Sequence, residues 1–299
     1  MTFTGIRPVL HTPFSDPSGT SIAFDELASL TRRMVDAGAA GVVTLGLASE
    51  ASALRDCERE HSVRTVVGAA GSVPVTVGIG GDTEPALRTA SRAAELGAHA
   101  LMVLPPPAEL GRDLRRHFAA LGAVGLPMLV QDSPQVTNVT LEVSDLLGLH
   151  DAVPQVRAVK IEGVGAGPKV SRLTAAGFDV VAGWGGLHYP ETLRRGARGL
   201  MPGCDLAAAF IALHDHWSAG RQRAADDLYD AVLGYLAYQA QSLELLILSA
   251  KRRLVATGVF AHGASRVAGA ALDDVQREWL DRCATQLTAR AVPGWVEPR

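Results

Sequence analysis

Eight short apolar segments alternate with helical patterns over residues 1–220 of this chain. Strands that are apolar on both faces and separated by helices indicate a parallel sheet covered on both sides. Eight such units predict an α/β fold of the (β/α)8 TIM-barrel type, and an open doubly wound sheet is the alternative. The predicted strands are residues 6–10, 42–45, 75–79, 100–104, 128–131, 156–161, 179–182 and 199–201.

Residues 221–299 continue the chain without a strand pattern. Apolar residues such as Leu228, Val232 and Leu236 recur there at helical spacing, which predicts two or three helices appended to the barrel. Because no linker is long enough to divide domains, we expect residues 1–220 to form the barrel and 221–299 a helical extension of the same domain. Residues 291–299 contain two prolines and are expected to be poorly ordered.

Charge and cysteine content exclude several classes of function. The net charge is −3 with both signs interspersed, so neither nucleic acid nor an anionic membrane is expected as a partner. The N-terminus lacks a signal-peptide pattern, and the longest aliphatic run, near residues 243–248, is too short to cross a bilayer. Cys57, Cys204 and Cys283 are isolated, which fits a reducing cytoplasm and excludes a CxxC-type metal or redox site. We expect a soluble, cytoplasmic protein.

Lys160 is the strongest candidate for chemistry. It lies in the apolar strand predicted over 156–161, and side chains alternate along a strand, so Glu162 points to the same side. The chain has three lysines among 28 basic residues, so a lysine in a buried strand needs a specific reason. Burial can lower a lysine pKa by about 3–5 units and give an amine that forms a Schiff base with a ketone. The alternative is an inert ion pair with Glu162.

Candidate ligands follow the second strand, at the end of the barrel where active sites of this fold lie. The backbone amides of Ala48 and Ser49 could hold a substrate carboxylate at a helix N-terminus. Glu50 comes next, and the alternative for this acid is contact with helix N–H groups alone. His214 and His216 are two apart on a predicted helix and do not share a face, so we expect no metal site.

Two further groups of candidates follow the fifth and seventh strands. Gln131 and Asp132 end the fifth strand and could contact substrate. Gly183 and Gly185 follow the seventh strand, in the position of the glycine-rich loops that hold phosphate in some barrels. Close packing of backbone at the barrel rim is the other interpretation of these glycines. Trp184 between them would partly close such a site.

The motifs resemble those of the dihydrodipicolinate synthase / N-acetylneuraminate lyase family of Schiff-base lyases. The resemblance covers essentially the whole chain and is carried by Thr12-Pro13-Phe14, the loop Gly46 to Glu50, the helix pattern Leu54…Glu58-Arg59, Lys160 and the appended helices. It implies a (β/α)8 barrel, an iminium between Lys160 and a small-molecule 2-oxo acid such as pyruvate or a keto-deoxy sugar acid, no cofactor, and a homotetramer.

The chain departs from the family pattern at the residues that usually relay protons. Leu47 and Ala48 stand where family synthases and aldolases usually carry hydroxyl residues, and Gln131 stands where a tyrosine ends the fifth strand. A further tyrosine expected after the fourth strand is missing from residues 105–107. The arginine that binds the second substrate in lysine-pathway synthases aligns with Val136. A dihydrodipicolinate synthase itself is therefore not expected.

Two elements instead look like the branch that contains L-2-keto-3-deoxyarabonate dehydratase, namely Gln131-Asp132-Ser133-Pro134 and Lys160-Ile161-Glu162. This similarity implies a dehydratase or hydratase in which Glu162 removes the C3 proton of the iminium. We expect desolvation to raise the pKa of Glu162. Two alternatives stay open: retro-aldol cleavage to pyruvate and an aldehyde by the same lysine, and a non-catalytic barrel that binds a small acid.

Overall fold

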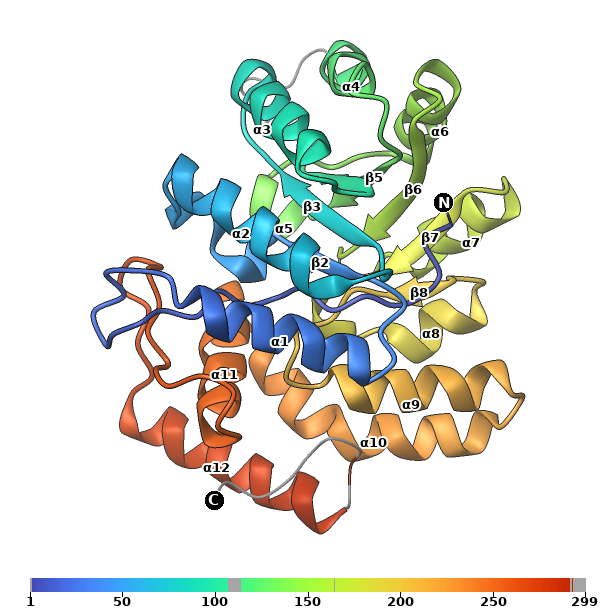
Figure 1. Ribbon diagram of the computed structural model, residues 1–299. Helices are drawn as coiled ribbons and strands as arrows, with labels where there is room; N and C mark the ends of the chain where they lie inside the picture. Colours follow the sequence, from blue (N-terminus) through green and yellow to red (C-terminus); the bar gives the residue numbers. More distant parts are fainter. Residues whose placement is uncertain (1, 107–113, 164, 291, 293–299) are drawn as a thin grey trace.

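A computed structural model describes residues 2–106, 114–163, 165–290 and 292 (Figure 1). The expectations for residues 107 and 291–299 fall outside these ranges, apart from Val292. The strands are β1 (Gly5–Ile6), β2 (Val42–Thr44), β3 (Val75–Ile79), β4 (Ala100–Val103), β5 (Met128–Asp132), β6 (Val156–Ile161), β7 (Asp179–Ala182) and β8 (Gly199–Leu200).

Helices follow the strands as the alternating pattern predicts. Those around the sheet are α1 (Phe24–Asp36), α2 (Asp56–Ala70), α3 (Thr83–Glu95), α4 (Leu114–Gly122), α5 (Pro134–Thr137), α6 (Val143–Ala152), α7 (Gly167–Ala175), α8 (Tyr189–Arg194) and α9 (Ala207–Ser218). The chain then forms α10 (Gln222–Gln239), α11 (Leu243–Ala256) and α12 (Asp274–Ala289). Short 3-10 turns are η1 (Leu47–Ser49), η2 (Ala51–Ala53) and η3 (Trp184–Gly186).

Within the described residues, eight parallel strands form one sheet in the order β1-β8-β7-β6-β5-β4-β3-β2. The sheet closes on itself because Val9, just beyond β1, bridges Val43 of β2. The amide of Val43 donates to the carbonyl of Pro8 at 2.9 Å, and the amide of Leu10 donates to the carbonyl of Val43 at 2.8 Å. The predicted (β/α)8 barrel is therefore confirmed, and an open doubly wound sheet is excluded.

Several strands are shorter than predicted for local reasons. The regular pairing of β1 stops at Ile6, and because Pro8 has no N–H to donate, the chain beyond it stays in the sheet through single hydrogen bonds at Arg7, Pro8 and Val9. β2 stops at Thr44 because Leu45 takes a left-handed conformation with φ of 57°. The run of short turns that follows, η1 and η2, was not predicted, and it delays the start of α2 to Asp56.

The helices α10, α11 and α12 gather on one side of the barrel, in the orange to red part of Figure 1. Among the residue pairs in contact, α10 packs against α9, α11 and α12, and α11 reaches the turn η1 after β2. The helical extension therefore touches the carboxyl end of the barrel, where the candidate site lies. In the parts of the chain that are described, no helix is both long and apolar enough to cross a membrane.

Candidate active site

Lys160 lies inside the barrel near the carboxyl end of β6. Ala158, two residues earlier, belongs to the cluster of side chains that fills the barrel interior, and side chains alternate along a strand. Lys160 therefore points inward, and it is only 4% exposed. Its Nζ lies 2.8 Å from Oε1 of Glu162, which is also buried. The structure thus brings the predicted amine and the predicted acid together as a buried ion pair.

The Glu162 carboxylate is held by two more groups besides Lys160. Nε2 of Gln131 donates a hydrogen bond to Oε2 at 2.7 Å, and the backbone amide of Trp184 donates to Oε1 at 3.1 Å. Burial by itself raises the pKa of Glu162, but the Lys160 charge and these hydrogen bonds outweigh burial and lower the pKa below its ordinary value. The expectation of a raised pKa is wrong because it treats the neighbouring amine as uncharged. The resting carboxylate can accept a proton.

One small cavity borders the pair, and a larger chamber adjoins that cavity. A cavity of about 30 Å³ has Ala48 and Gly185 in its walls together with Lys160. A larger chamber of about 400 Å³ adjoins it, since Leu47 and Leu243 line both. A chamber of this volume falls in the range of small-molecule sites, about 300–1,000 Å³. The reactive amine therefore has room beside it for a small substrate.

Gly183 is a glycine because the ion pair leaves no space for a side chain. A Cβ at this position would lie 2.4 Å from Cγ of Glu162 and 2.8 Å from Cε of Lys160. The next residue, Trp184, has φ of 48°, and its indole Nε1 donates to the carbonyl of Ala240 at 2.9 Å. The loop after β7 is thus fixed in a strained conformation that aims the Trp184 amide at Glu162. At Gly183 the structure agrees with close packing of backbone at the barrel rim, the second interpretation of these glycines. Ligand binding by Gly183 and Gly185 stays a prediction.

Gly183→Ala tests whether that close packing sets the geometry of the pair. The added methyl group forces Glu162 and Lys160 apart, so we expect activity to fall about 10²-fold while overpacking lowers the free energy of unfolding by about 1–3 kcal/mol. Steady-state rates and thermal unfolding of the same preparation measure the two effects. Gly234→Ala, at a position of α10 with no atom within 4 Å of the added Cβ and no positive φ, is the control for glycine replacement as such. Wild-type rates in Gly183→Ala would contradict the assignment.

The two amides predicted for the loop after β2 differ in their environment. The amide of Ser49 donates to the carbonyl of Gly46 at 3.0 Å, and its hydroxyl donates to the carbonyl of Leu10 at 2.6 Å. Ser49 therefore builds the turn η1. Ala48 is the second residue of that turn, before the residues whose amides close its internal hydrogen bonds, and it lines the cavity beside Lys160. The carboxylate-binding prediction thus fits Ala48 better than Ser49.

The structure does not bring Asp132 together with Lys160. Along β5, Gln131 is in register with Lys160, whereas Asp132 is in register with Ile161 and points to the opposite side. There its carboxylate pairs with Lys169 of α7, which also donates to the backbone carbonyl of Leu141. The pKa of Asp132 is raised, chiefly by burial. Asp132 therefore joins β5 to the outer helices, whereas Gln131 belongs to the site.

The sequence profile of the Dihydrodipicolinate synthetase family matches residues 2–265 of this chain. The chain belongs to that family. Members are Schiff-base lyases and synthases, so this is an enzyme family, and the position of Lys160 inside the barrel agrees with its chemistry.

Among characterised members of the family, the chain is 31% identical to an L-2-keto-3-deoxyarabonate dehydratase from Azospirillum brasilense over 271 residues, which cover 86% of this chain and 85% of the dehydratase. It is 30% identical to a 4-hydroxy-tetrahydrodipicolinate synthase from Natronomonas pharaonis over 195 residues, which cover 63% of this chain and 66% of the synthase. The family is thus secure, and the sequence matches include both a dehydratase and synthases.

Solved structures of the family show the same fold. A dihydrodipicolinate synthase from Rhodopseudomonas palustris superposes with a TM-score of 0.89 at 24% identity and covers 96% of this chain and 99% of its own. A prophage protein of the family from E. coli K12, solved in complex with pyruvate, superposes with a TM-score of 0.87 at 22% identity and with the same coverage. At these identities the likeness concerns the fold.

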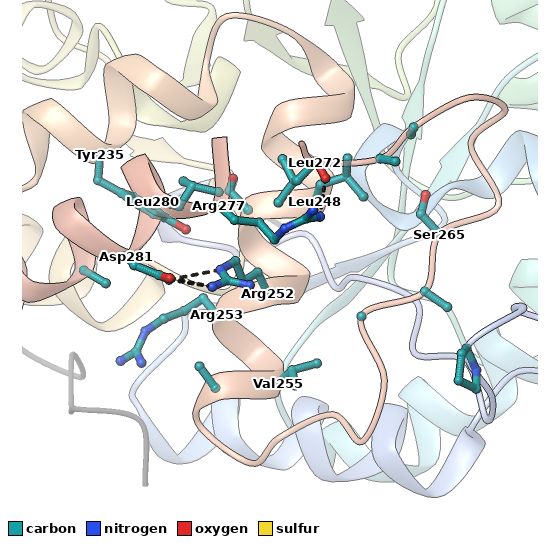
Figure 2. Close-up of a pocket in the computed structure, with 18 residues that line it drawn as sticks. Tyr235, Leu248, Arg252, Arg253, Val255, Ser265, Leu272, Arg277, Leu280 and Asp281 are labelled. Atoms are coloured by element: carbon teal, nitrogen blue, oxygen red, sulfur yellow. Dashed lines mark hydrogen bonds and ion pairs between the residues drawn. The ribbon is translucent and has the colours of Figure 1, made fainter. Parts of the chain in front are cut away.

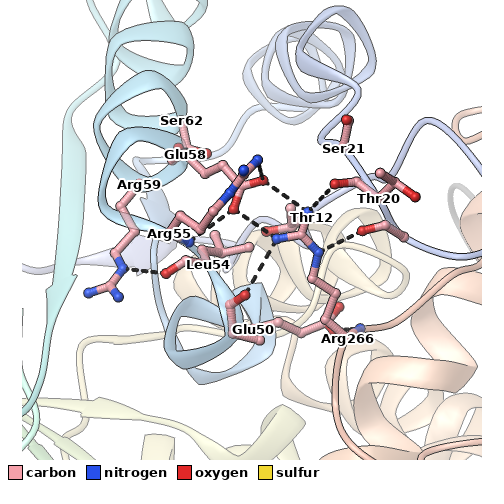
Figure 3. A network of polar contacts seen from close by, with 12 residues as sticks. Thr12, Thr20, Ser21, Glu50, Leu54, Arg55, Glu58, Arg59, Ser62 and Arg266 are labelled. Atoms are coloured by element: carbon pink, nitrogen blue, oxygen red, sulfur yellow. Dashed lines mark hydrogen bonds and ion pairs between the residues drawn. The ribbon is translucent and has the colours of Figure 1, made fainter.

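The helical extension clamps the loop that carries Ala48, a feature that was not predicted (Figure 3). Glu50 pairs with Lys251 of α11, and its other oxygen accepts from the hydroxyl of Ser265 at 2.8 Å and from the amide of Arg266 at 2.6 Å. The guanidinium of Arg266 binds both carboxylate oxygens of Glu58, at 2.8 and 2.9 Å. We call Lys251, Ser265 and Arg266 the C-terminal clamp. The alternative prediction, that Glu50 contacts helix N–H groups alone, is therefore wrong.

Lys251→Met tests the clamp. The Lys251 and Glu50 side chains are 1% and 0% exposed, so removing the ammonium leaves a buried carboxylate without its charge partner. Breaking such a pair costs about 3–5 kcal/mol of unfolding free energy. Denaturant unfolding measures the loss, and the double variant Lys251→Met/Glu50→Gln should recover part of it. A Lys251→Met protein as stable as the wild type would show that the clamp contributes nothing.

A larger cavity, of about 760 Å³, lies elsewhere, between α10, α11 and α12 (Figure 2). Two of the three arginines that line it pair with acids: Arg252 pairs with Asp281 at 2.7 Å, and Arg277 pairs with Asp274 at 2.6 Å. Among the residues that the structure describes, none lines both this cavity and the one at Lys160. In the same ranges, no three His, Cys, Asp or Glu side chains gather to hold a metal ion.

Proposed function

We propose that this family member is a lysine Schiff-base dehydratase, or hydratase in the reverse direction, that acts on a 2-keto-3-deoxy sugar acid or a related 2-oxo acid. The observation that carries the proposal is the buried pair of Lys160 and Glu162, 2.8 Å apart at the carboxyl end of the barrel. An amine and a carboxylate at this distance supply a nucleophile and a base to the same substrate carbon chain.

The first half of the reaction forms the iminium. Glu162 accepts the Lys160 proton, and the neutral amine attacks C2 of the 2-oxo acid. Glu162 passes this proton to the C2 oxygen and then relays a second proton to it from the attached nitrogen, so the oxygen leaves as water when the carbon–nitrogen double bond forms. Ala48, with its amide at the start of η1, is the proposed ligand of the substrate carboxylate.

The second half uses the iminium as an electron sink. Glu162 removes a proton from C3, and the enamine that forms expels the C4 hydroxyl, which leaves as water with the proton from Glu162. Hydrolysis of the conjugated iminium releases the dehydrated 2-oxo acid and the free Lys160 amine. Gln131 keeps the carboxylate in place through its hydrogen bond of 2.7 Å. Its amide has no proton to transfer at ordinary pH, so Glu162 carries the proton transfers alone.

Retro-aldol cleavage is the second candidate, because the same iminium can also break the C3–C4 bond and several synthase relatives match the chain. The products separate the two reactions. Incubation is carried out with a panel of 4-hydroxy-2-oxo acids that includes L-2-keto-3-deoxyarabonate, and an acid that is turned over should yield a dehydrated 2-oxo acid, seen by mass spectrometry as loss of one water, without pyruvate in a coupled assay. Pyruvate and an aldehyde would favour the aldolase, and no turnover across the panel would favour a binding barrel. The homotetramer stays a prediction.

A further inference from the structure

The chamber beside Lys160 has apolar walls. It has a volume of about 400 Å³ and lies between the loop after β2, the ends of β3 and β4, and the helix α11. The aliphatic side chains that line it are Leu45, Leu47, Ile79, Leu104, Leu243, Ile247 and Val267. A substrate whose C2 is bonded to Lys160 must place the remainder of its carbon chain in the neighbouring space, and this chamber is the larger of the two adjoining spaces.

The polar side chains of the inner chamber already have partners within the protein. Glu50 binds Lys251 and the clamp residue Ser265, and Gln131 donates to Glu162 at 2.7 Å. The Glu50 carboxylate is therefore directed at protein groups, and Gln131 uses one of its two amide N–H donors on Glu162, so the inner chamber has few polar groups beside its aliphatic walls.

The remaining polar side chains lie toward the rim. The hydroxyl of Thr89 donates to the carbonyl of Pro85 at 3.0 Å, and Nε of Arg59 donates to the carbonyl of Leu54 at 2.9 Å. Ser52 is exposed to solvent. A hydroxyl group buried against the aliphatic walls would therefore lose its water with few protein groups to replace it, which is unfavourable.

From these walls we infer that the substrate is a 2-oxo acid with an apolar tail beyond the reacting carbons, rather than a polyhydroxylated sugar acid. The inference rests on the proposed Schiff-base function and narrows its substrate class. An apolar tail buries its surface against Leu104 and Ile247, whereas a polyol tail leaves its hydroxyls unpaired. Leu47, which lines both the chamber and the small cavity at Lys160, contributes to the same preference.

A set of five-carbon 2-oxo acids tests the tail directly. Each acid is incubated with the protein and borohydride, and the concentration that gives half-maximal adduct on Lys160 is measured. The probes are 2-oxopentanoate, with an apolar tail; L-2-keto-3-deoxyarabonate, with hydroxyls; and 2-oxoglutarate, with a carboxylate. Pyruvate, which has no tail, is the reference. We expect the half-maximal concentration of 2-oxopentanoate to be about tenfold lower than that of pyruvate. The two acids with polar tails should show no such decrease.

Leu104→Ser places a hydroxyl in the chamber wall. It should reduce the ratio of the half-maximal concentrations of pyruvate and 2-oxopentanoate at least about threefold, while pyruvate is trapped at the same concentration as before. Leu233→Ser, at an exposed leucine of α10, is the matched control and should leave the ranking unchanged. If pyruvate is trapped but a polar tail gains as much as the apolar one, the tail inference is overturned and the Schiff-base function stands. If no acid is trapped, both are overturned.

Discussion

Lys160→Met is expected to abolish turnover, by on the order of 10⁴-fold or more, because it removes the nucleophile and with it every covalent intermediate. Methionine keeps most of the volume of the lysine stem, but Glu162 loses its charge partner. We therefore also expect a loss of about 3–5 kcal/mol in unfolding free energy, as for other broken buried pairs. Initial rates and denaturant unfolding measure the two effects on the same protein.

Two companion variants separate chemistry from stability. Lys160→Met/Glu162→Gln removes both charges and should recover much of the unfolding free energy while turnover stays absent. Lys169→Met is the matched lysine replacement, since Lys169 also pairs with an acid, Asp132, but on the outer side of β5. It should still form the pyruvate adduct on Lys160. Measurable turnover by Lys160→Met would end the assignment of this amine as the nucleophile.

Glu162→Gln should lower turnover by about 10²–10⁴-fold, the usual contribution of a positioned general base. The replacement keeps the shape of the side chain and an oxygen that can accept from the Trp184 amide, so the barrel end should stay in place. Trapping of pyruvate on Lys160 at equilibrium should be largely retained, because loss of the carboxylate slows the proton transfers of iminium formation but leaves the nucleophilic amine in place. Single-turnover rates and borohydride adducts measure the two steps separately.

The comparison with Gln131→Met sharpens this test. Gln131 positions Glu162 through one hydrogen bond, so its loss should reduce turnover less than loss of the carboxylate and should shift the pH profile of turnover. The profile should move toward higher pH, since the lost hydrogen bond lowers the pKa of Glu162 in the wild type. Unchanged turnover in Glu162→Gln would remove the base from the mechanism.

Much of the fold follows from the sequence because parallel strands buried on both faces leave strong apolar runs. Alternation of side chains along a strand also predicts that Lys160 and Glu162 point to the same side, and the ion pair between them agrees with this prediction. Alternation along β5 also separates Gln131 from Asp132, so the different positions of these two neighbours could have been predicted from the strand pattern. The error lay in treating both as site residues.

The C-terminal clamp could not be found in this way, because Glu50 and Lys251 are far apart in the chain and on different elements. A weak signal existed: in a chain that uses arginine as its surface cation, each of the three lysines pairs with an acid, Glu162, Asp132 or Glu50. The lowered pKa of Glu162 could not be predicted from the sequence either, because it depends on hydrogen bonds from Gln131 and Trp184 that only the folded barrel assembles.

The most direct measurement of the central claim is reductive trapping with pyruvate, followed by peptide mapping of the modified lysine. The chain has three lysines, all with acidic partners, and only Lys160 has its amine in the barrel interior beside the cavity. We predict that borohydride fixes one pyruvate-derived group on Lys160 and leaves Lys169 and Lys251 unmodified. An adduct on either of those lysines, or no adduct at all with pyruvate and the longer 2-oxo acids, would contradict the account.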